Sequence, residues 1–113
     1  MRRGIVLTVA LAAFACASTP PPRGAVARAE QSVARAEQEG ANQHAPLPLR
    51  KAQDELEKAQ RALREERNED ALRAAELAQA QADLALASAQ RARAQDLVEE
   101  LSQTVGALEE ETR

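Results

Sequence analysis

Apolar residues recur every three or four positions from residue 24 onward, the spacing that places them on one face of an α-helix. Residues 26–31 (VARAEQ) are repeated seven residues later at 33–38, and Gly40 follows as a natural helix stop. The pattern therefore predicts a first amphipathic helix over about 24–39. Its apolar stripe consists of Val26, Ala29, Val33 and Ala36.

A second helix is predicted beyond a break at residues 41–48, because Pro46 and Pro48 cannot lie inside a helix. Pro48 can occupy the first position of the new helix, which is expected to extend to about Arg67. The apolar stripe of this helix is formed by Leu49, Ala52, Leu56, Ala59 and Leu63.

The third helix is expected to begin at Asn68, a favoured capping residue followed by two acidic side chains. It runs to about Glu110, a rod of about 60 Å at about 1.5 Å per residue. Its main stripe is Leu77, Ala80, Leu84, Ala87, Arg91, Ala94, Val98, Leu101, Val105 and Leu108. A second stripe is made of alanine alone: Ala71, Ala75, Ala78, Ala82, Ala85, Ala89 and Ala92. We expect the two stripes together to contact two neighbouring helices over residues 71–92.

These elements predict an all-α fold, a helical hairpin or three-helix bundle with one long C-terminal helix. The short turn at 67–69 makes the second and third helices antiparallel neighbours. Because the second helix has about half the length of the third, it covers only the first half. The residues expected to be the most exposed apolar side chains form a candidate partner-binding seam: Val98, Leu101, Val105 and Leu108. The alternative is that this end folds back or frays.

Arg91 interrupts the main stripe at a position where a core residue is expected. One interpretation is that its side chain snorkels to the surface beyond the end of the second helix. The other is that Arg91 marks a register or partner contact, as polar residues do in coiled-coil cores. We therefore add Arg91 to the candidate seam.

Residues 1–15 have the layout of a secretory signal peptide, with a basic start and then eleven mostly apolar residues from Ile5 to Ala15. That run is too short for a membrane-spanning helix, which needs about 20 residues. Cys16 follows directly, in the position of the lipidated cysteine of a bacterial lipoprotein signal, which this segment resembles. The alternative is an ordinary signal-peptidase site, with Ala13 and Ala15 as its small residues and a lone thiol at the new N-terminus.

Residues 16–23 are expected to form a lipid-bearing tether, stiffened by three prolines at 20–22, ahead of a helical domain at 24–113. The resemblance to Gram-negative lipoproteins implies a place on the outer membrane, because no Asp follows Cys16. A membrane is therefore the expected partner, held through the lipid anchor.

Composition narrows the function classes further. Alanine accounts for 27 of the 113 residues, and one Phe is the only aromatic residue, which argues against a β-sandwich or barrel. The net charge is −3 for the whole chain, and removal of residues 1–15 takes away two arginines and leaves −5. An acidic chain of this kind is not expected to bind nucleic acid. One His and one Cys provide no zinc-type ligand set, and we expect no metal and no cofactor.

Catalytic chemistry has one candidate, His44, which would need a nucleophile and an orienting carboxylate beside it. We interpret His44 as a ring packed at a helix connector, and the acidic run at 109–111 as a solvated tail rather than a metal site. No catalytic residue is therefore assigned.

The connector at residues 40–46 and the order of the helices resemble those of one bacterial family. Gly40-Ala41, His44-Ala45-Pro46, a Leu-rich helix over 49–63 and an acidic helix start at 69–70 occur in the order seen in one bacterial family. The chain resembles domain of unknown function 4398, small exported helical proteins that are often lipidated. His44 stands where that family usually has Tyr. Some members continue into an OmpA-like peptidoglycan-binding domain, and we expect this chain to act without one.

The sequence thus leads to two function hypotheses. The first is a non-enzymatic, outer-membrane-anchored periplasmic lipoprotein that serves as a structural or interaction module, bound to an unidentified envelope protein or to itself. The second is a soluble periplasmic chaperone or adaptor whose long helix binds a partner.

Overall fold

The computed structural model describes residues 19–113, and within that range every regular element is a helix. The elements are α1 (Arg23–Gln38), α2 (Ala41–His44), α3 (Pro46–Arg64) and α4 (Asn68–Glu111). The expected all-α fold with one long C-terminal helix is confirmed. Signal peptide, Cys16 and the first part of the tether lie outside the described residues.

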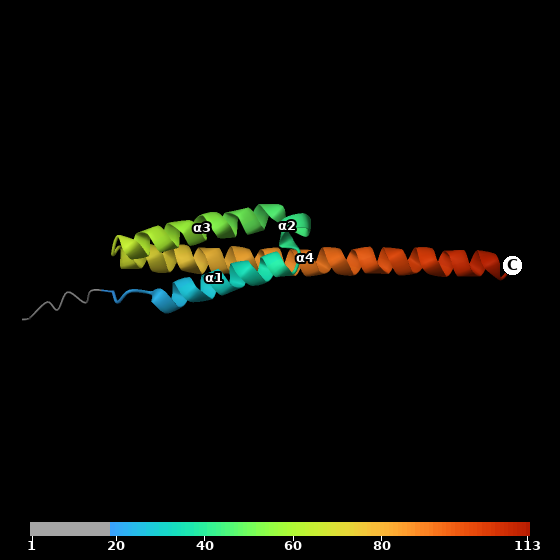
Figure 1. Cartoon of the computed structure of the whole chain (residues 1–113), viewed down its shortest axis with the longest axis horizontal. Helices are drawn as coiled ribbons and strands as arrows, with labels where there is room; N and C mark the ends of the chain where they lie inside the picture. Colours follow the sequence, from blue (N-terminus) through green and yellow to red (C-terminus); the bar gives the residue numbers. More distant parts are fainter. Residues whose placement is uncertain (1–18) are drawn as a thin grey trace, which may run out of the picture.

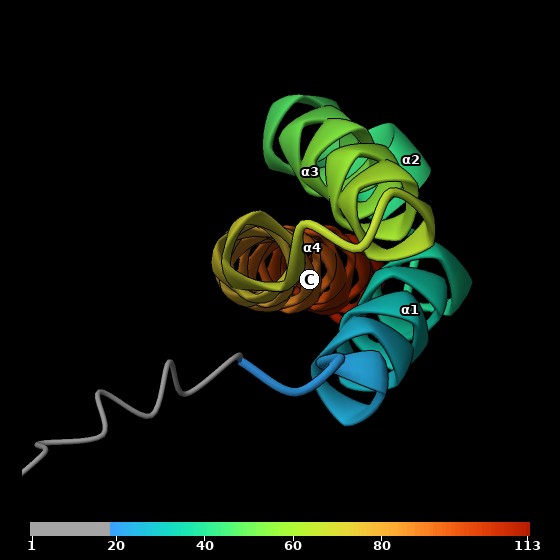
Figure 2. The ribbon, with the colours of Figure 1, turned by 90° about the vertical axis from the view of Figure 1, so that its left-hand side faces the viewer.

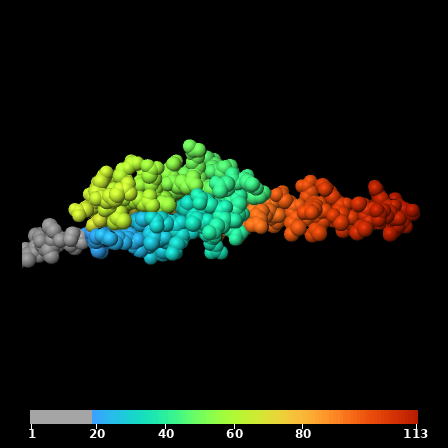
Figure 3. All heavy atoms as spheres, viewed as in Figure 1, coloured from blue at the N-terminus to red at the C-terminus, as the bar shows by residue number. Residues whose placement is uncertain are grey.

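The architecture is a short three-helix bundle built on one end of a long rod. α3 runs antiparallel to α4, and α1 lies beside both of them, as Figures 1 and 2 show. α4 has 44 residues, about 66 Å at about 1.5 Å per residue, whereas α1 and α3 have 16 and 19. Both short helices pack on the N-terminal half of α4, and no other part of residues 19–113 packs on its C-terminal half (Figure 3).

The core is built almost entirely of alanine. Three larger side chains, Val26, Val33 and Leu49, are buried, and all other buried residues of the described range are alanines. α4 contributes seven of them: Ala71, Ala74, Ala75, Ala78, Ala82, Ala85 and Ala89. Because alanine ends at Cβ, the helix backbones approach closely, and each contact buries little area.

The main stripe of α4 was expected to face the bundle, and this prediction is wrong. Leu77 is 49 % exposed and Leu84 is 54 % exposed, while the alanines beside them are buried against α1 and α3. The partly buried Leu72 and Leu86 of α4 pack next to these alanines. A face of leucines would hold the neighbouring helices farther apart, whereas the alanine face lets two helices pack closely at once. The leucine stripe is therefore turned to solvent.

The connection between α1 and α3 is more regular than the predicted break. Gly40 adopts a left-handed backbone conformation, with φ of 89°, and ends α1. The single-turn helix α2 follows, and α3 begins at Pro46 instead of Pro48. Both prolines thus lie in the first turn of α3, where a missing N–H group costs nothing.

The turn between α3 and α4 uses a glutamate where glycine is usual. Glu66 has φ of 57°. The N–H group of Arg67 donates to the carbonyl oxygen of Ala62 at 2.9 Å, and that of Glu66 donates to Leu63 at 3.2 Å, the two bonds of a Schellman motif. This tight closure makes α3 and α4 antiparallel neighbours, as predicted.

Asn68 was expected to cap α4 with its side chain, and the structure places it differently. The capping position is Arg67, with no side-chain hydrogen bond to the backbone of the helix. The Asn68 amide instead donates to the carbonyl oxygen of Thr19 at 2.7 Å. The hydroxyl of Thr19 donates to the Glu69 carboxylate at 3.4 Å. Residue 19 is therefore held at the corner between α3 and α4.

Candidate functional site

The free half of α4 is the most distinctive surface of the described chain. From Arg93 to Arg113, every residue is exposed. The bundle ends at the same point, where the Arg93 guanidinium pairs with the Glu39 carboxylate at 2.9 Å and ties the end of α1 to α4. The helix then continues for 18 residues, to Glu111, without contacts to the other described helices.

The predicted seam lies on this free half. Its four apolar side chains are all exposed, between 53 % and 65 %: Val98, Leu101, Val105 and Leu108. The sequence analysis missed Leu97, which is 55 % exposed. At 100° per residue Leu97 lies on the same side of the helix as Leu101 and Leu108. Its place on the seam could therefore have been predicted from the helical spacing. The expectation that the four are the most exposed apolar residues is wrong, since Leu47 at the start of α3 reaches 66 %. Leu97 and Leu84, at 55 % and 54 %, are also slightly more exposed than Val105 at 53 %.

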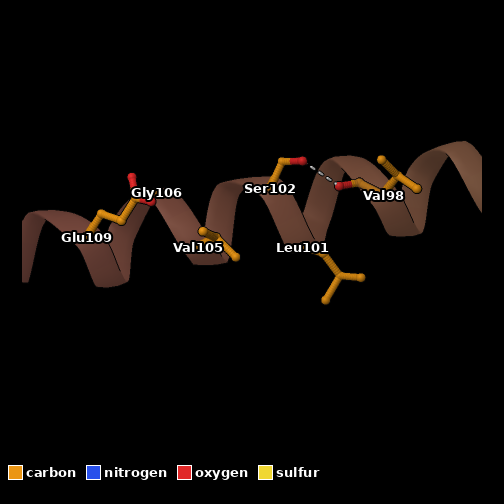
Figure 4. A pocket seen from close by; sticks show the side chains of 6 residues that line it. All are labelled: Val98, Leu101, Ser102, Val105, Gly106 and Glu109. Atoms are coloured by element: carbon orange, nitrogen blue, oxygen red, sulfur yellow. Dashed lines mark hydrogen bonds between the residues drawn. The ribbon is translucent and has the colours of Figure 1, made fainter.

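Figure 4 shows how the distal seam is arranged along α4. A shallow hollow there is lined by Val98, Leu101, Ser102, Val105, Gly106 and Glu109. The Ser102 hydroxyl donates to the carbonyl oxygen of Val98 at 2.9 Å, so its polar atom is satisfied within the helix. Gly106 has no atom near the position that a Cβ would take, and leaves a gap between the apolar side chains.

Arg91 lies exposed at the proximal end of this surface. It borders a second, mostly apolar hollow together with Ala94, Gln95, Val98 and Glu99. The first interpretation, an arginine at the surface, fits its exposure. Arg91 also connects the seam to Leu84 and Leu77, two stripe residues of α4 that are exposed as well.

Three ion pairs in the bundle raise the pKa values of two basic residues, Lys58 and Arg67. The Lys58 ammonium donates to Glu55 at 2.7 Å, and this hydrogen bond raises the pKa of Lys58. Hydrogen bonds from Arg67 to Glu65 and to Asp70 raise the pKa of Arg67. Both groups remain cationic at neutral pH, and both lie on the α3–α4 corner region rather than on the free half of α4.

The other residues singled out from the sequence are not brought into one site. His44 is half-buried at the end of α2, beside Gly40. The acidic run at 109–111 is exposed at the end of α4. Over residues 19–113 no three His, Cys, Asp or Glu side chains are close enough to hold a metal ion. Within the same range no helix has both the length and the apolar character to cross a bilayer.

The family model described as domain of unknown function (DUF4398) matches residues 24–101. The chain belongs to this family. The DUF4398 match begins at α1 and ends at Leu101, so it includes the whole bundle and the first part of the seam, while Val105 and Leu108 follow it. No curated protein and no solved structure matches the chain. Membership of DUF4398 agrees with the resemblance found in the connector and carries no assigned activity.

Proposed function

We propose that the chain is a lipoprotein of the cell envelope, anchored to the periplasmic face of the outer membrane, and that it acts as a non-enzymatic helical interaction module. The lipid would be carried by Cys16, which directly follows the eleven-residue apolar run of the signal-like segment. The unpartnered apolar seam of α4 is the observation that carries the interaction role, because a contiguous apolar surface of this kind usually binds another molecule.

The position of residue 19 supports a defined orientation of the anchored protein. Thr19 is bonded to Asn68 at the α3–α4 corner, and Cys16 lies three residues earlier in the chain. Three residues span at most about 10 Å. The anchor would therefore lie near the bundle end, at the opposite end of α4 from the seam (Figure 1).

A second candidate function is a soluble periplasmic chaperone or adaptor that uses the same surface of α4. Ala13 and Ala15 favour it, since small residues at these two positions suit an ordinary signal peptidase. The two proposals differ only in what happens at Cys16.

Mass spectrometry of the mature protein from its own host separates the two. The lipoprotein proposal expects a chain that begins at Cys16 with an added diacylglyceryl group and fatty acid, and that partitions with outer-membrane vesicles. A Cys16→Ser variant is expected to lose both the added mass and the membrane partition. An unmodified Cys16 at the N-terminus, or a start at Ser18, would contradict the lipid anchor and favour the soluble adaptor.

The interaction role is tested by crosslinking in the intact envelope. We expect the wild-type chain to be crosslinked through the free half of α4, and Leu101→Glu to lose these products. A Leu47→Glu variant is the matched control, because Leu47 is also an exposed leucine, at 66 % against 56 % for Leu101, but lies on α3. If Leu101→Glu and the wild-type chain give the same products, the seam has no binding role.

A further inference from the structure

The exposed stripe of α4 has the regular spacing of a coiled-coil seam. Its residues alternate by three and four positions through five consecutive heptads, and all ten are exposed. The first position of the heptads is occupied by Leu77, Leu84, Arg91, Val98 and Val105. The fourth position is occupied by Ala80, Ala87, Ala94, Leu101 and Leu108.

The other helices of the chain do not cover this stripe. α1 and α3 pack on the alanine face, and that face points away from the stripe: Ala85 is fully buried, whereas its neighbour Leu84 is 54 % exposed. A sustained heptad pattern is matched best by another helix with the same pattern, because each apolar side chain then fits between four residues of the facing helix. An identical chain carries such a helix.

We propose that this seam binds the same seam of a second copy of the chain, as an antiparallel two-stranded coiled coil over residues 91–108. The inference rests on the interaction role proposed above, and it does not depend on lipid at Cys16. The two helices cross between Val98 and Leu101, so that a twofold axis relates the copies and each contact occurs twice.

The register follows from pairing first-position with fourth-position residues across an antiparallel pair. Val98 then faces the partner's Leu101, and Ala94 faces the partner's Val105. Arg91 faces the partner's Leu108, the last apolar residue of the seam. The larger apolar side chains of the free half are thus covered by their equivalents, and Leu77 and Leu84 lie outside the overlap.

Charge selects the antiparallel arrangement. Arg91 stands at one end of the paired segment, and Glu109 and Glu111 flank Leu108 at the other end. In the antiparallel pair each Arg91 lies beside these two carboxylates of the partner, which gives two sets of opposite charges. Valine at the first position and leucine at the fourth also suit a parallel pair, but that pair would set Arg91 against Arg91 and bring the two acidic ends together.

A lipid surface fits the same face less well. The free half of α4 carries Asp96, Glu99, Glu100 and the acidic run at 109–111, so an anionic membrane would repel it. A second copy offers both the apolar complement and, in Arg91, a cation for Glu109 and Glu111.

The first test is the molar mass of the Cys16→Ser chain, exported and processed in its host, by analytical ultracentrifugation. We expect a dimer at concentrations on the order of 10 µM. Leu101→Glu should weaken dimerisation by about 100-fold or more, since it places two carboxylates in the centre of the interface. Leu84→Glu is the matched control: it introduces the same charge into the same stripe outside the overlap, and should leave the dimer unchanged.

The second test fixes the orientation by disulfide formation between single-cysteine variants in the Cys16→Ser background. Ala94→Cys and Val105→Cys chains of different mass are mixed and oxidised. The antiparallel register predicts the mixed disulfide, because residue 94 faces the partner's residue 105, while like residues are separated along the axis by about 16 Å. Disulfides between like residues alone would show a parallel pair and overturn the register.

The outcomes also separate this inference from the proposed function. A wild-type chain that stays monomeric at about 100 µM overturns self-association. If it nevertheless yields Leu101-dependent crosslinks to another protein in the envelope, the interaction module stands and only the identity of the partner is wrong. Thermal melts by circular dichroism show that each variant is folded, and a Leu101→Glu chain without a cooperative melt would place Leu101 in the core and overturn both.

Discussion

Leu84 and Ala85 are consecutive residues of α4, yet the larger side chain is 54 % exposed and the smaller one is fully buried. At these two positions the helix therefore turns alanine toward α1 and α3 and leucine toward solvent. Stability of the bundle depends on close approach of three backbones rather than on large side chains. The same arrangement leaves leucine and valine free to bind something outside the monomer.

Substitution of Ala85 should change the free energy of unfolding much more than substitution of Leu84. Ala85→Leu adds three carbons between α4 and its neighbours, which cannot separate without opening the contacts on either side. We expect it to lower the free energy of unfolding by about 1–3 kcal/mol. Leu84→Ala is the control and should change it by less than about 0.5 kcal/mol. Urea titration of both variants measures the difference, and equal effects would contradict the buried position of Ala85.

Leu49 is the most buried leucine of the described chain, at 2 % exposed, and Leu47 is among the most exposed apolar residues only two positions away. Leu49→Ala should cost about 2–5 kcal/mol, because it leaves a cavity in a core that has few large side chains. Leu47→Ala on the same helix should be nearly neutral. Thermal melts of the pair check this, and a neutral Leu49→Ala would show that the contact between α1, α3 and α4 is loose.

Gly40 and Glu66 both have a left-handed backbone conformation, which glycine adopts most easily. Removing glycine at residue 40 and introducing glycine at residue 66 should therefore have opposite effects on stability. Gly40→Ala introduces a Cβ at φ of 89° and should destabilise the chain by about 1 kcal/mol. Glu66→Gly removes one at φ of 57° and should stabilise it by up to about 1 kcal/mol. Gly106→Ala is a useful third variant, since that glycine lies in a regular part of α4 and alanine favours helix there. Denaturant midpoints of the three variants would order them.

The proposed ion pairs across the dimer can be tested by exchange of charge. Arg91→Glu should weaken dimerisation, because the new carboxylate would lie beside Glu109 and Glu111 of the partner. The effect expected is about 10-fold, in line with partly exposed charge pairs. Adding Glu109→Arg and Glu111→Arg should restore the wild-type dissociation constant, measured by ultracentrifugation at low salt.

The control for this exchange is the Glu109→Arg, Glu111→Arg chain with Arg91 retained. It carries like charges at both ends of the seam and should be the weakest dimer of the set. If the triple variant associates no better than Arg91→Glu alone, the charges do not face one another and the register is wrong.

The helices and their order could be predicted from the sequence, because glycine, proline and the apolar spacing mark each boundary. Which stripe of α4 faces the bundle could not be predicted in this way. A leucine stripe has more to gain from burial than an alanine stripe, and that reasoning selected Leu77 and Leu84. The deciding effect is how near two helices can come when most of the residues between them are alanine.

Other differences arise from contacts between segments that are far apart in the chain. Asn68 has the residue type of a helix cap, but a backbone carbonyl 49 residues earlier takes its hydrogen bond. The seam was found because it depends only on relative helix lengths, and those follow from sequence. Leu97 was missed because only the main stripe was followed, although helical geometry places it beside Leu101.

The alanine face of α4 ends abruptly, and this has a mechanical consequence. The positions that carry Ala82, Ala85 and Ala89 within the bundle are taken one or two heptads later by Asp96, Glu99 and Gln103. An interface of identical small residues has little to prevent one helix from sliding along another by a heptad. The charged residues beyond Ala92 act as a stop, since a bundle displaced by one heptad toward the free end would have to bury the Asp96 carboxylate. The length of α4 left projecting is thus set by where alanine gives way to aspartate.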